Sequence, residues 1–108
     1  MKVYIAGPYT GGDPVLNVRA AIKAGDRVAQ EGHTPFVPHL YHFWHLLFPH
    51  DYEFWMRLDF DWLPACEALI RLPGDSSGAD REVSMAKELG LPVYDGVDVF
   101  LQHVGEQS

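Results

Sequence analysis

The chain has 108 residues, of which 47% are hydrophobic and 21% charged. We expect one domain over 1–108, and this composition excludes a wholly disordered chain. Fifteen acidic and eight basic residues give a net charge of −7, which disfavours polymeric nucleic acid because phosphate backbones need clustered cations. No apolar run is long enough to predict a membrane span, and the single cysteine, Cys66, cannot form an internal disulfide. These features favour a cytoplasmic protein that binds a small molecule.

Short apolar segments alternate with helical patterns along the chain. The expected strands are 2–6, 35–38, 66–72 and 91–94. The expected helices are 14–32 (Asp13 as N-cap, Gly32 as C-cap), 51–63, 79–89 and 98–104, while the aromatic segment 39–50 has no clear pattern. This alternation predicts an α/β fold, a three-layer, Rossmann- or flavodoxin-like parallel sheet of about four strands with helices on both faces. Ligands bind beyond the carboxyl ends of such strands, so the loops 7–13, 38–51 and 73–78 are the candidate binding loops.

One acidic residue falls on the apolar face of the expected helix 79–89. The inward stripe consists of Ala79, Val83, Ala86 and Leu89, and Glu82 projects between the last two. Glu82 also lies in the first turn, at the carboxyl edge of the sheet. The structural alternative is that Glu82 only complements the helix dipole, beside a capping-box spacing at 77–80.

A second carboxylate, Asp59, falls on the aromatic face of the expected helix 51–63. Its neighbours on this face are Tyr52, Trp55, Met56, Trp62 and Leu63. A carboxylate there must be paired, hydrogen-bonded or protonated. The structural alternative is an aspartate bonded to a backbone N–H or to a histidine.

The two inward carboxylates, Glu82 and Asp59, suggest chemistry at a glycosidic bond. Such reactions use one carboxylate that attacks or stabilises the sugar cation and another that manages protons. A helix N-terminus should keep Glu82 ionised, which suits a nucleophile. Aromatic surroundings should raise the pKa of Asp59, which suits a proton donor.

Several short motifs resemble those of one enzyme superfamily. They are IAGPY at 5–9, GHTP at 32–35 followed by PH at 38–39, DFDWL at 59–63 followed by Glu67, and SSG at 76–78 followed by Glu82. Together they are similar to the nucleoside 2-deoxyribosyltransferases and to their 2'-deoxynucleoside 5'-phosphate N-hydrolase relatives. The resemblance covers nearly the whole chain and points to a short branch of this superfamily.

The resemblance implies cleavage or transfer of the N-glycosidic bond of a (deoxy)nucleoside or its 5'-monophosphate. Glu82 matches the glutamate that forms a glycosyl-enzyme, and Asp59 matches the aspartate near the sugar hydroxyls and the departing base. Ser76 matches a position that contacts the 5' end of the sugar, and Tyr9 falls where the family lines the sugar and base pocket. Neither a cofactor nor a metal is expected.

Three further residues are expected to bind substrate: Gly7, His39 and Gly78. His39 directly follows the second expected strand, and the N–H groups of Gly78 and its neighbour suit an anion at a helix N-terminus. The chain departs from the family at Glu67, where an aspartate is usual, and in its first loop, which lacks the arginine used for phosphate. A free nucleoside or a monophosphate, and water or a second base as acceptor, therefore remain open.

The histidine spacing His39-x-x-His42-x-x-His45 permits another hypothesis, a zinc-dependent hydrolase. Successive i, i+3 steps drift round a helix, which counts against shared ligation. The neighbouring apolar residues predict instead a lid or a homo-oligomer contact. They are Tyr41, Phe43, Trp44, Leu46, Leu47 and Phe48, with Phe54, Leu58 and Phe60. Two other functions are also compatible with the sequence, a nucleotide-binding module without turnover and a structural oligomer. Cys66 is expected to pack as a small hydrophobic residue.

Overall fold

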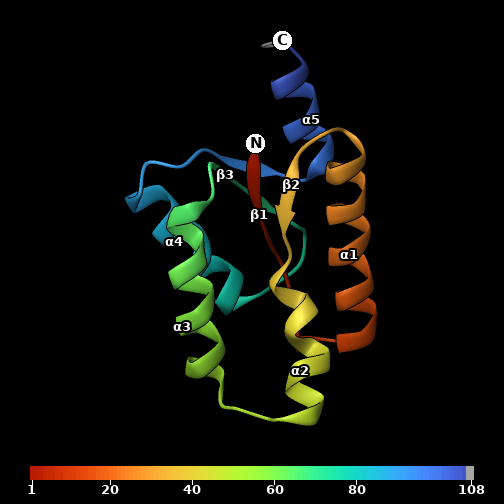
Figure 1. Cartoon of the computed structure of the whole chain (residues 1–108), viewed down its shortest axis with the longest axis vertical. Coiled ribbons are helices and arrows are strands. Elements are labelled where there is room, and N and C mark those ends of the chain that lie inside the picture. The colour runs from red at the N-terminus through yellow and green to blue at the C-terminus, as the bar shows by residue number, and fades with distance from the viewer. Residues whose placement is uncertain (107–108) are drawn as a thin grey trace.

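The computed structural model describes residues 1–106, and its centre is a parallel sheet of four strands. The strands are β1 (Lys2–Ala6), β2 (Thr34–Phe36), β3 (Ala68–Arg71) and β4 (Val93–Asp95). Their order is β2-β1-β3-β4, and every neighbouring pair is parallel (Figure 1). All four strands therefore end at the same edge of the sheet, which is where a ligand is expected.

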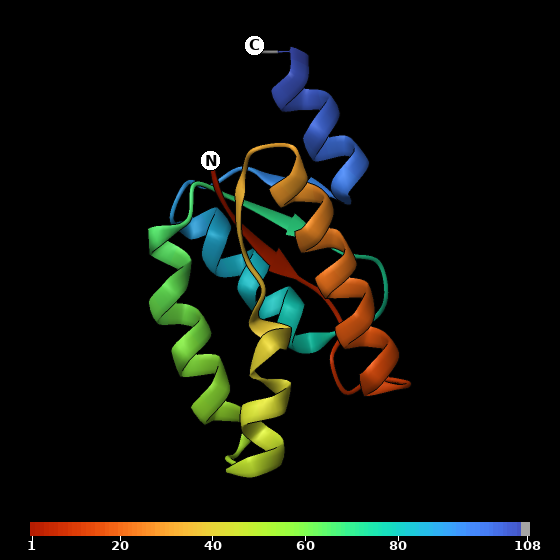
Figure 2. The same cartoon turned by 45° about the vertical axis from the view of Figure 1, so that its right-hand side comes forward.

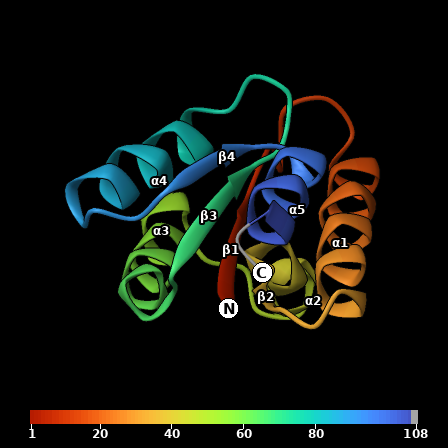
Figure 3. The same cartoon turned by 90° about the horizontal axis from the view of Figure 1, so that it is seen from above.

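Helices cover both faces of the sheet (Figure 3). They are α1 (Pro14–Gln30), α2 (Tyr41–Leu47), α3 (Tyr52–Trp62), α4 (Ser77–Glu88) and α5 (Val97–Glu106), with short 3-10 turns η1 (Pro38–Leu40) and η2 (Leu63–Ala65). α1 and α5 cover one face, α3 and α4 cover the other, and α2 lies beyond the carboxyl edge of the sheet (Figure 2). The three-layer α/β fold predicted from the alternation is confirmed. No helix within 1–106 is both long and apolar enough to cross a membrane.

Side-chain alternation along β1 divides the core into two. Val3 and Ile5 pack with α1 and α5, whereas Tyr4 and Ala6 pack on the other face with α4 and η2. Tyr4 is fully buried, and it lies on the same side of the sheet as Glu82. Cys66 packs in this second cluster as a small apolar residue, as expected.

One helix cap matches the sequence and two differ. Asp13 accepts hydrogen bonds from the N–H groups of Val15 and Leu16, as expected of an N-cap. α1 ends at Gln30 with Glu31 as its C-cap, so Gly32, whose φ is +88°, lies one residue beyond the C-cap rather than at it. The N-cap of α4 is Ser76, which accepts from the N–H of Ala79 at 3.1 Å. The predicted capping box at 77–80 and the helix start at 79 are therefore wrong.

Other boundaries also differ from the expected ones. The strands β2, β3 and β4 are 34–36, 68–71 and 93–95 rather than 35–38, 66–72 and 91–94, because pairing with the neighbouring strand, and not the apolar run, sets where each strand begins and ends. α5 extends over 97–106, and 39–50 contains η1 and α2. Leu89 is 43% exposed, so the inward stripe of α4 ends at Ala86.

Gly25 sets the approach of α1 to the chain leading into η1. A Cβ at this position would lie 2.7 Å from Cγ2 of Val37, a stiff β-branched side chain.

Although Gly→Ala normally stabilises a helix, we predict that Gly25→Ala lowers the free energy of unfolding by about 1–3 kcal/mol through overpacking. Urea denaturation of the variant and of the wild type measures this difference in the free energy of unfolding. Gly105→Ala in α5, where a Cβ meets nothing within 4 Å, is the matched control and should gain up to about 0.5 kcal/mol. Equal effects of the two substitutions would contradict this packing argument.

Candidate active site

A cavity of about 490 Å³ opens at the carboxyl edge of the sheet. Its walls come from the loop after β1, from η1 and α2, from α3 and from the start of α4. All seven residues singled out from the sequence line it: Gly7, Tyr9, His39, Asp59, Ser76, Gly78 and Glu82. The volume is in the usual range of small-molecule sites. The fold thus brings together residues that are far apart in the sequence.

Glu82 is buried at the inner wall of the cavity, 5% exposed. The hydroxyl of Tyr4 donates a hydrogen bond to its Oε2 atom. Burial, and after it the nearby charge of Asp59, raises the pKa of Glu82 well above the ordinary value for a glutamate. The expectation that the helix N-terminus keeps Glu82 ionised is therefore wrong. Loss of water and a like charge, which raise this pKa, outweigh the hydrogen bond from Tyr4 and the charge of Arg71, which lower it.

Asp59 faces Glu82 from α3 and is 8% exposed. Burial raises its pKa to about 6, and hydrogen bonds with Glu82 and Tyr4 partly offset that rise. The partners of Asp59 are therefore the second carboxyl and a phenol, rather than the backbone N–H or histidine of the structural alternative. Burial of both groups, and the charge of Asp59 beside Glu82, favour the protonated form, so the pair holds a proton more strongly than isolated carboxyls do. The Oδ1 atom of Asp59 is buried with no hydrogen-bond partner among the described residues.

Tyr4 is a site residue that the sequence argument missed. Burial raises its pKa, so its hydroxyl remains a proton donor. The signal was present, because a tyrosine in the middle of a buried strand must place its hydroxyl against a polar partner. The strand pattern did not say which partner.

His39 closes the cavity beside the loop after β1. Its Nε2 donates to the carbonyl oxygen of Pro8 at 2.8 Å, and its Nδ1 atom is buried without a hydrogen-bond partner within residues 1–106. Burial lowers the pKa of His39, so the ring is neutral and Nδ1 is an acceptor. Tyr9 stands edge-on to this ring, with centroids 6.1 Å apart, and its hydroxyl is 2.5 Å from Nδ1 of His42.

The three histidines of the zinc hypothesis have separate partners. His39 bonds to Pro8 and His42 to Tyr9, whereas Nδ1 of His45 accepts from the indole N–H of Trp55 at 2.9 Å. Across 1–106 no group of three or more His, Cys, Asp or Glu side chains is arranged to hold a metal ion. Residues 1–106 therefore contain no set of ligands that would support the zinc-hydrolase hypothesis.

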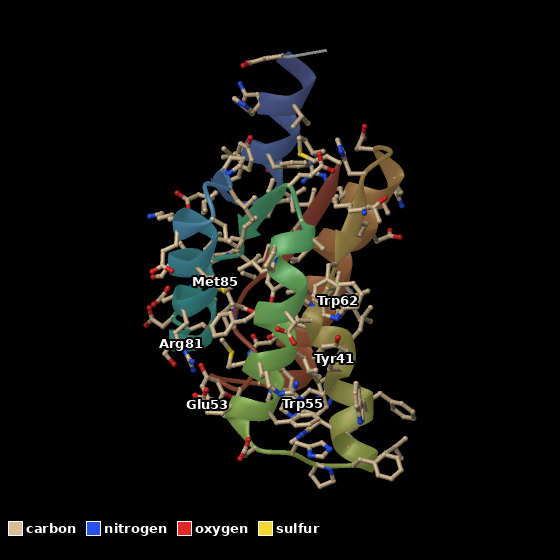
Figure 4. The ribbon with its side chains drawn as sticks, turned by 60° about the vertical axis from the view of Figure 1, so that its left-hand side comes forward. Tyr41, Glu53, Trp55, Trp62, Arg81 and Met85 are labelled. Carbon is tan, nitrogen blue, oxygen red and sulfur yellow. The ribbon has the colours of Figure 1, made fainter. Side chains whose placement is uncertain are left out.

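Close packing between α3 and α4 fixes the two carboxyls relative to each other. A Cβ on Gly78 would lie 3.1 Å from the hydroxyl oxygen of Tyr52, so glycine permits this approach. Arg81 on α4 bonds both carboxylate oxygens of Glu53 on α3, at 2.8 and 3.3 Å (Figure 4). It also lies over the rings of Tyr52 and Phe60, at 5.5 and 5.3 Å from their centroids.

Arg71 fixes the loop that leads into α4. Its guanidinium donates to the carbonyl oxygens of Leu72 and Gly74, and it pairs with Asp80 at 3.2 Å. Arg71 and Arg81 thus have protein partners, and no arginine or lysine of 1–106 lines the cavity, whereas Asp75 does. The lining is consequently acidic at the end near α4.

Comparison with known proteins identifies the family of the chain and a solved structure with a similar fold. The model of DUF4406, a domain of unknown function, matches residues 1–95. A solved structure of a 2-deoxyribosyltransferase from Bacillus psychrosaccharolyticus superposes with a TM-score of 0.61 at 22% identity, over 86% of this chain and 69% of that one. No curated protein matches the sequence. The chain therefore belongs to the DUF4406 family and has the fold of a nucleoside 2-deoxyribosyltransferase.

Proposed function

We propose that the chain cleaves or transfers the N-glycosidic bond of a (deoxy)nucleoside or its 5'-monophosphate. The observation that carries this proposal is the buried pair Glu82 and Asp59, which lines a cavity of about 490 Å³, with the hydroxyl of Tyr4 bonded to Glu82 from behind. The likeness of fold to a 2-deoxyribosyltransferase supports it. Glu82 is the proposed nucleophile, and Asp59 the proposed proton donor.

The shared proton defines the order of events. Glu82 must be ionised to attack, so the proton of the pair moves onto Asp59, and the Tyr4 hydroxyl stabilises the Glu82 anion. A Glu82 oxygen then bonds to the anomeric carbon while the carbon–nitrogen bond breaks. The electron pair of the breaking carbon–nitrogen bond goes to the base, and the base takes the proton from Asp59. Water or a second base next bonds to the anomeric carbon and displaces Glu82 as a free carboxylate, and the proton that the acceptor loses returns to the Asp59 carboxylate.

The remaining lining residues are proposed to hold the substrate. Ser76 and Gly78 lie at the start of α4, near the 5' end of the sugar in this proposal. Gly7, Tyr9 and His39 form the opposite wall of the cavity. No step of this scheme uses a metal or a cofactor, and a cytoplasmic location stays a prediction.

Glu82→Gln tests the nucleophile. We expect the variant to lower the release of free base from 2'-deoxynucleosides or their monophosphates by at least about 10³-fold, because the amide cannot form the glycosyl-enzyme. Chromatography of a panel of ribo- and 2'-deoxy compounds, with and without an acceptor base, measures this loss.

Glu88→Gln is the matched control, since Glu88 is on the same helix but exposed. It should leave base release unchanged. If the wild type binds these compounds but releases no base with any acceptor, the chain is a binding module and the proposed function is wrong.

Asp59→Asn tests the coupling between the two carboxyls. Two main causes raise the pKa of Glu82: its burial and the nearby charge of Asp59. The variant leaves the burial in place but removes the charge. The pKa of Glu82 should therefore fall, which moves its ionisation to lower pH. A ¹³C NMR titration of the Glu82 side chain measures the shift without needing activity. An unchanged or higher pKa would contradict the coupling.

The outer face of α2 is proposed to contact a second copy of the chain. Its large apolar residues are 59–67% exposed: Leu40, Phe43, Leu46, Leu47 and Phe48. Such a continuous apolar surface is unusual on a monomer. Light scattering should give a mass above the 12.2 kDa of one chain, and the double variant Phe43→Lys, Leu47→Lys should be monomeric. Val99→Lys on α5 is the exposed control, and a monomeric wild type would contradict this contact.

A further inference from the structure

The outer end of the cavity is aromatic, in contrast to its acidic inner end. Tyr41, His45, His50 and Trp55 line it, from α2, the following loop and α3. The rings of Tyr41 and Trp55 lie 5.5 Å apart in a tilted pair, and the ring of His45 stands at 76° to that of Trp55. Figure 4 shows Tyr41 and Trp55 together between α2 and α3.

This aromatic end is one helical turn away from the reacting carboxyls. Trp55 precedes Asp59 by four residues on α3, which corresponds to about 6 Å along the helix axis. A sugar whose anomeric carbon is at Glu82 would direct its base along this wall. The flat faces of Tyr41 and Trp55 suit such a base, and His45 lies beside them to meet its edge.

The hydrogen bonds of His45 fix its tautomer. Its Nδ1 accepts from the indole N–H of Trp55 at 2.9 Å and from the backbone N–H of His50 at 3.3 Å. An indole N–H can only donate, so Nδ1 carries no proton and the proton of the neutral ring is on Nε2. The ring therefore offers a ligand one polar group, a fixed N–H donor.

We infer that His45, held by Trp55 in its Nε2–H form, is the specificity-determining donor of the base subsite and selects bases with an oxo group. This inference rests on the proposed function. A 6-oxopurine presents O6 and N7 as neighbouring acceptors, whereas adenine places an amino donor beside N7. Uracil and thymine present O4 where cytosine presents an amino group. The amino group of adenine or cytosine would face the Nε2–H of His45 with a second donor, so neither group would find an acceptor.

Matched substrates test the selection. The wild type should have a kcat/KM for deoxyinosine about tenfold or more above that for deoxyadenosine, and likewise for deoxyuridine over deoxycytidine, because an opposed donor loses its hydrogen bond. Trp55→Phe keeps an aromatic ring but removes the shorter of the two hydrogen bonds to Nδ1. Only the backbone N–H of His50, at 3.3 Å, then remains, so the other tautomer of His45 becomes accessible. The oxo-to-amino ratio should then fall toward one.

Trp44→Phe is the matched control. Trp44 belongs to the same aromatic cluster, 5.0 Å from Trp55, but does not line the cavity. It should keep the wild-type ratio. An equal fall in the ratio for both variants would assign the effect to general loosening of the α2–α3 packing and would overturn the inference.

The tautomer itself has a readout that needs no turnover. The ¹⁵N NMR shifts of His45, assigned by comparison with His45→Gln, should show a protonated Nε2 in the wild type and a mixture in Trp55→Phe. A protonated Nδ1 in the wild type, or turnover of oxo and amino bases at equal rates, overturns the inference alone. If no nucleoside binds even to the Glu82→Gln variant, the proposed function fails and the base subsite fails with it.

Discussion

The buried contact between Glu82 and Asp59 is the constraint on which the rest of the site depends. Burial and the charge of Asp59 raise the pKa of Glu82, and burial raises the pKa of Asp59, so the pair holds a proton more strongly than isolated carboxyls do. Tyr4 completes the arrangement by donating to Glu82 from the centre of the sheet. In the proposed reaction, the proton that the pair holds goes to the departing base, and the carboxylate of Glu82 is the nucleophile.

The fold keeps these carboxyls in place with contacts that are weak individually. The exposed pair between Arg81 and Glu53 adds little stability by itself, but its two-pronged geometry sets the orientation of α4 against α3. The absence of a Cβ at Gly78 lets α4 approach Tyr52, and Arg71 holds the preceding loop by its carbonyl groups. These contacts position a site in which burial is the first cause of the raised pKa of both carboxyls.

Much of the fold and the two carboxyls could be predicted from the sequence, because helical periodicity shows which face a residue occupies. It placed Glu82 and Asp59 inward without a structure. It could not give the pKa of Glu82, which depends on burial and on a residue 23 positions away in the chain. Tyr4 was missed because strand alternation identifies a core face and not the partner of a hydroxyl. The pattern of 39–50 was unreadable because α2 packs by one side and leaves large apolar residues exposed on the other.

The central claim is that Glu82 bonds covalently to the sugar. Mass spectrometry of the intact protein, acid-quenched within milliseconds of mixing with a 2'-deoxynucleoside, measures this bond directly. The account predicts a mass increase of one deoxyribosyl group, located by peptide mapping to the segment of α4 that contains Glu82. Release of base with no adduct at any time, or an adduct on another residue, would contradict it.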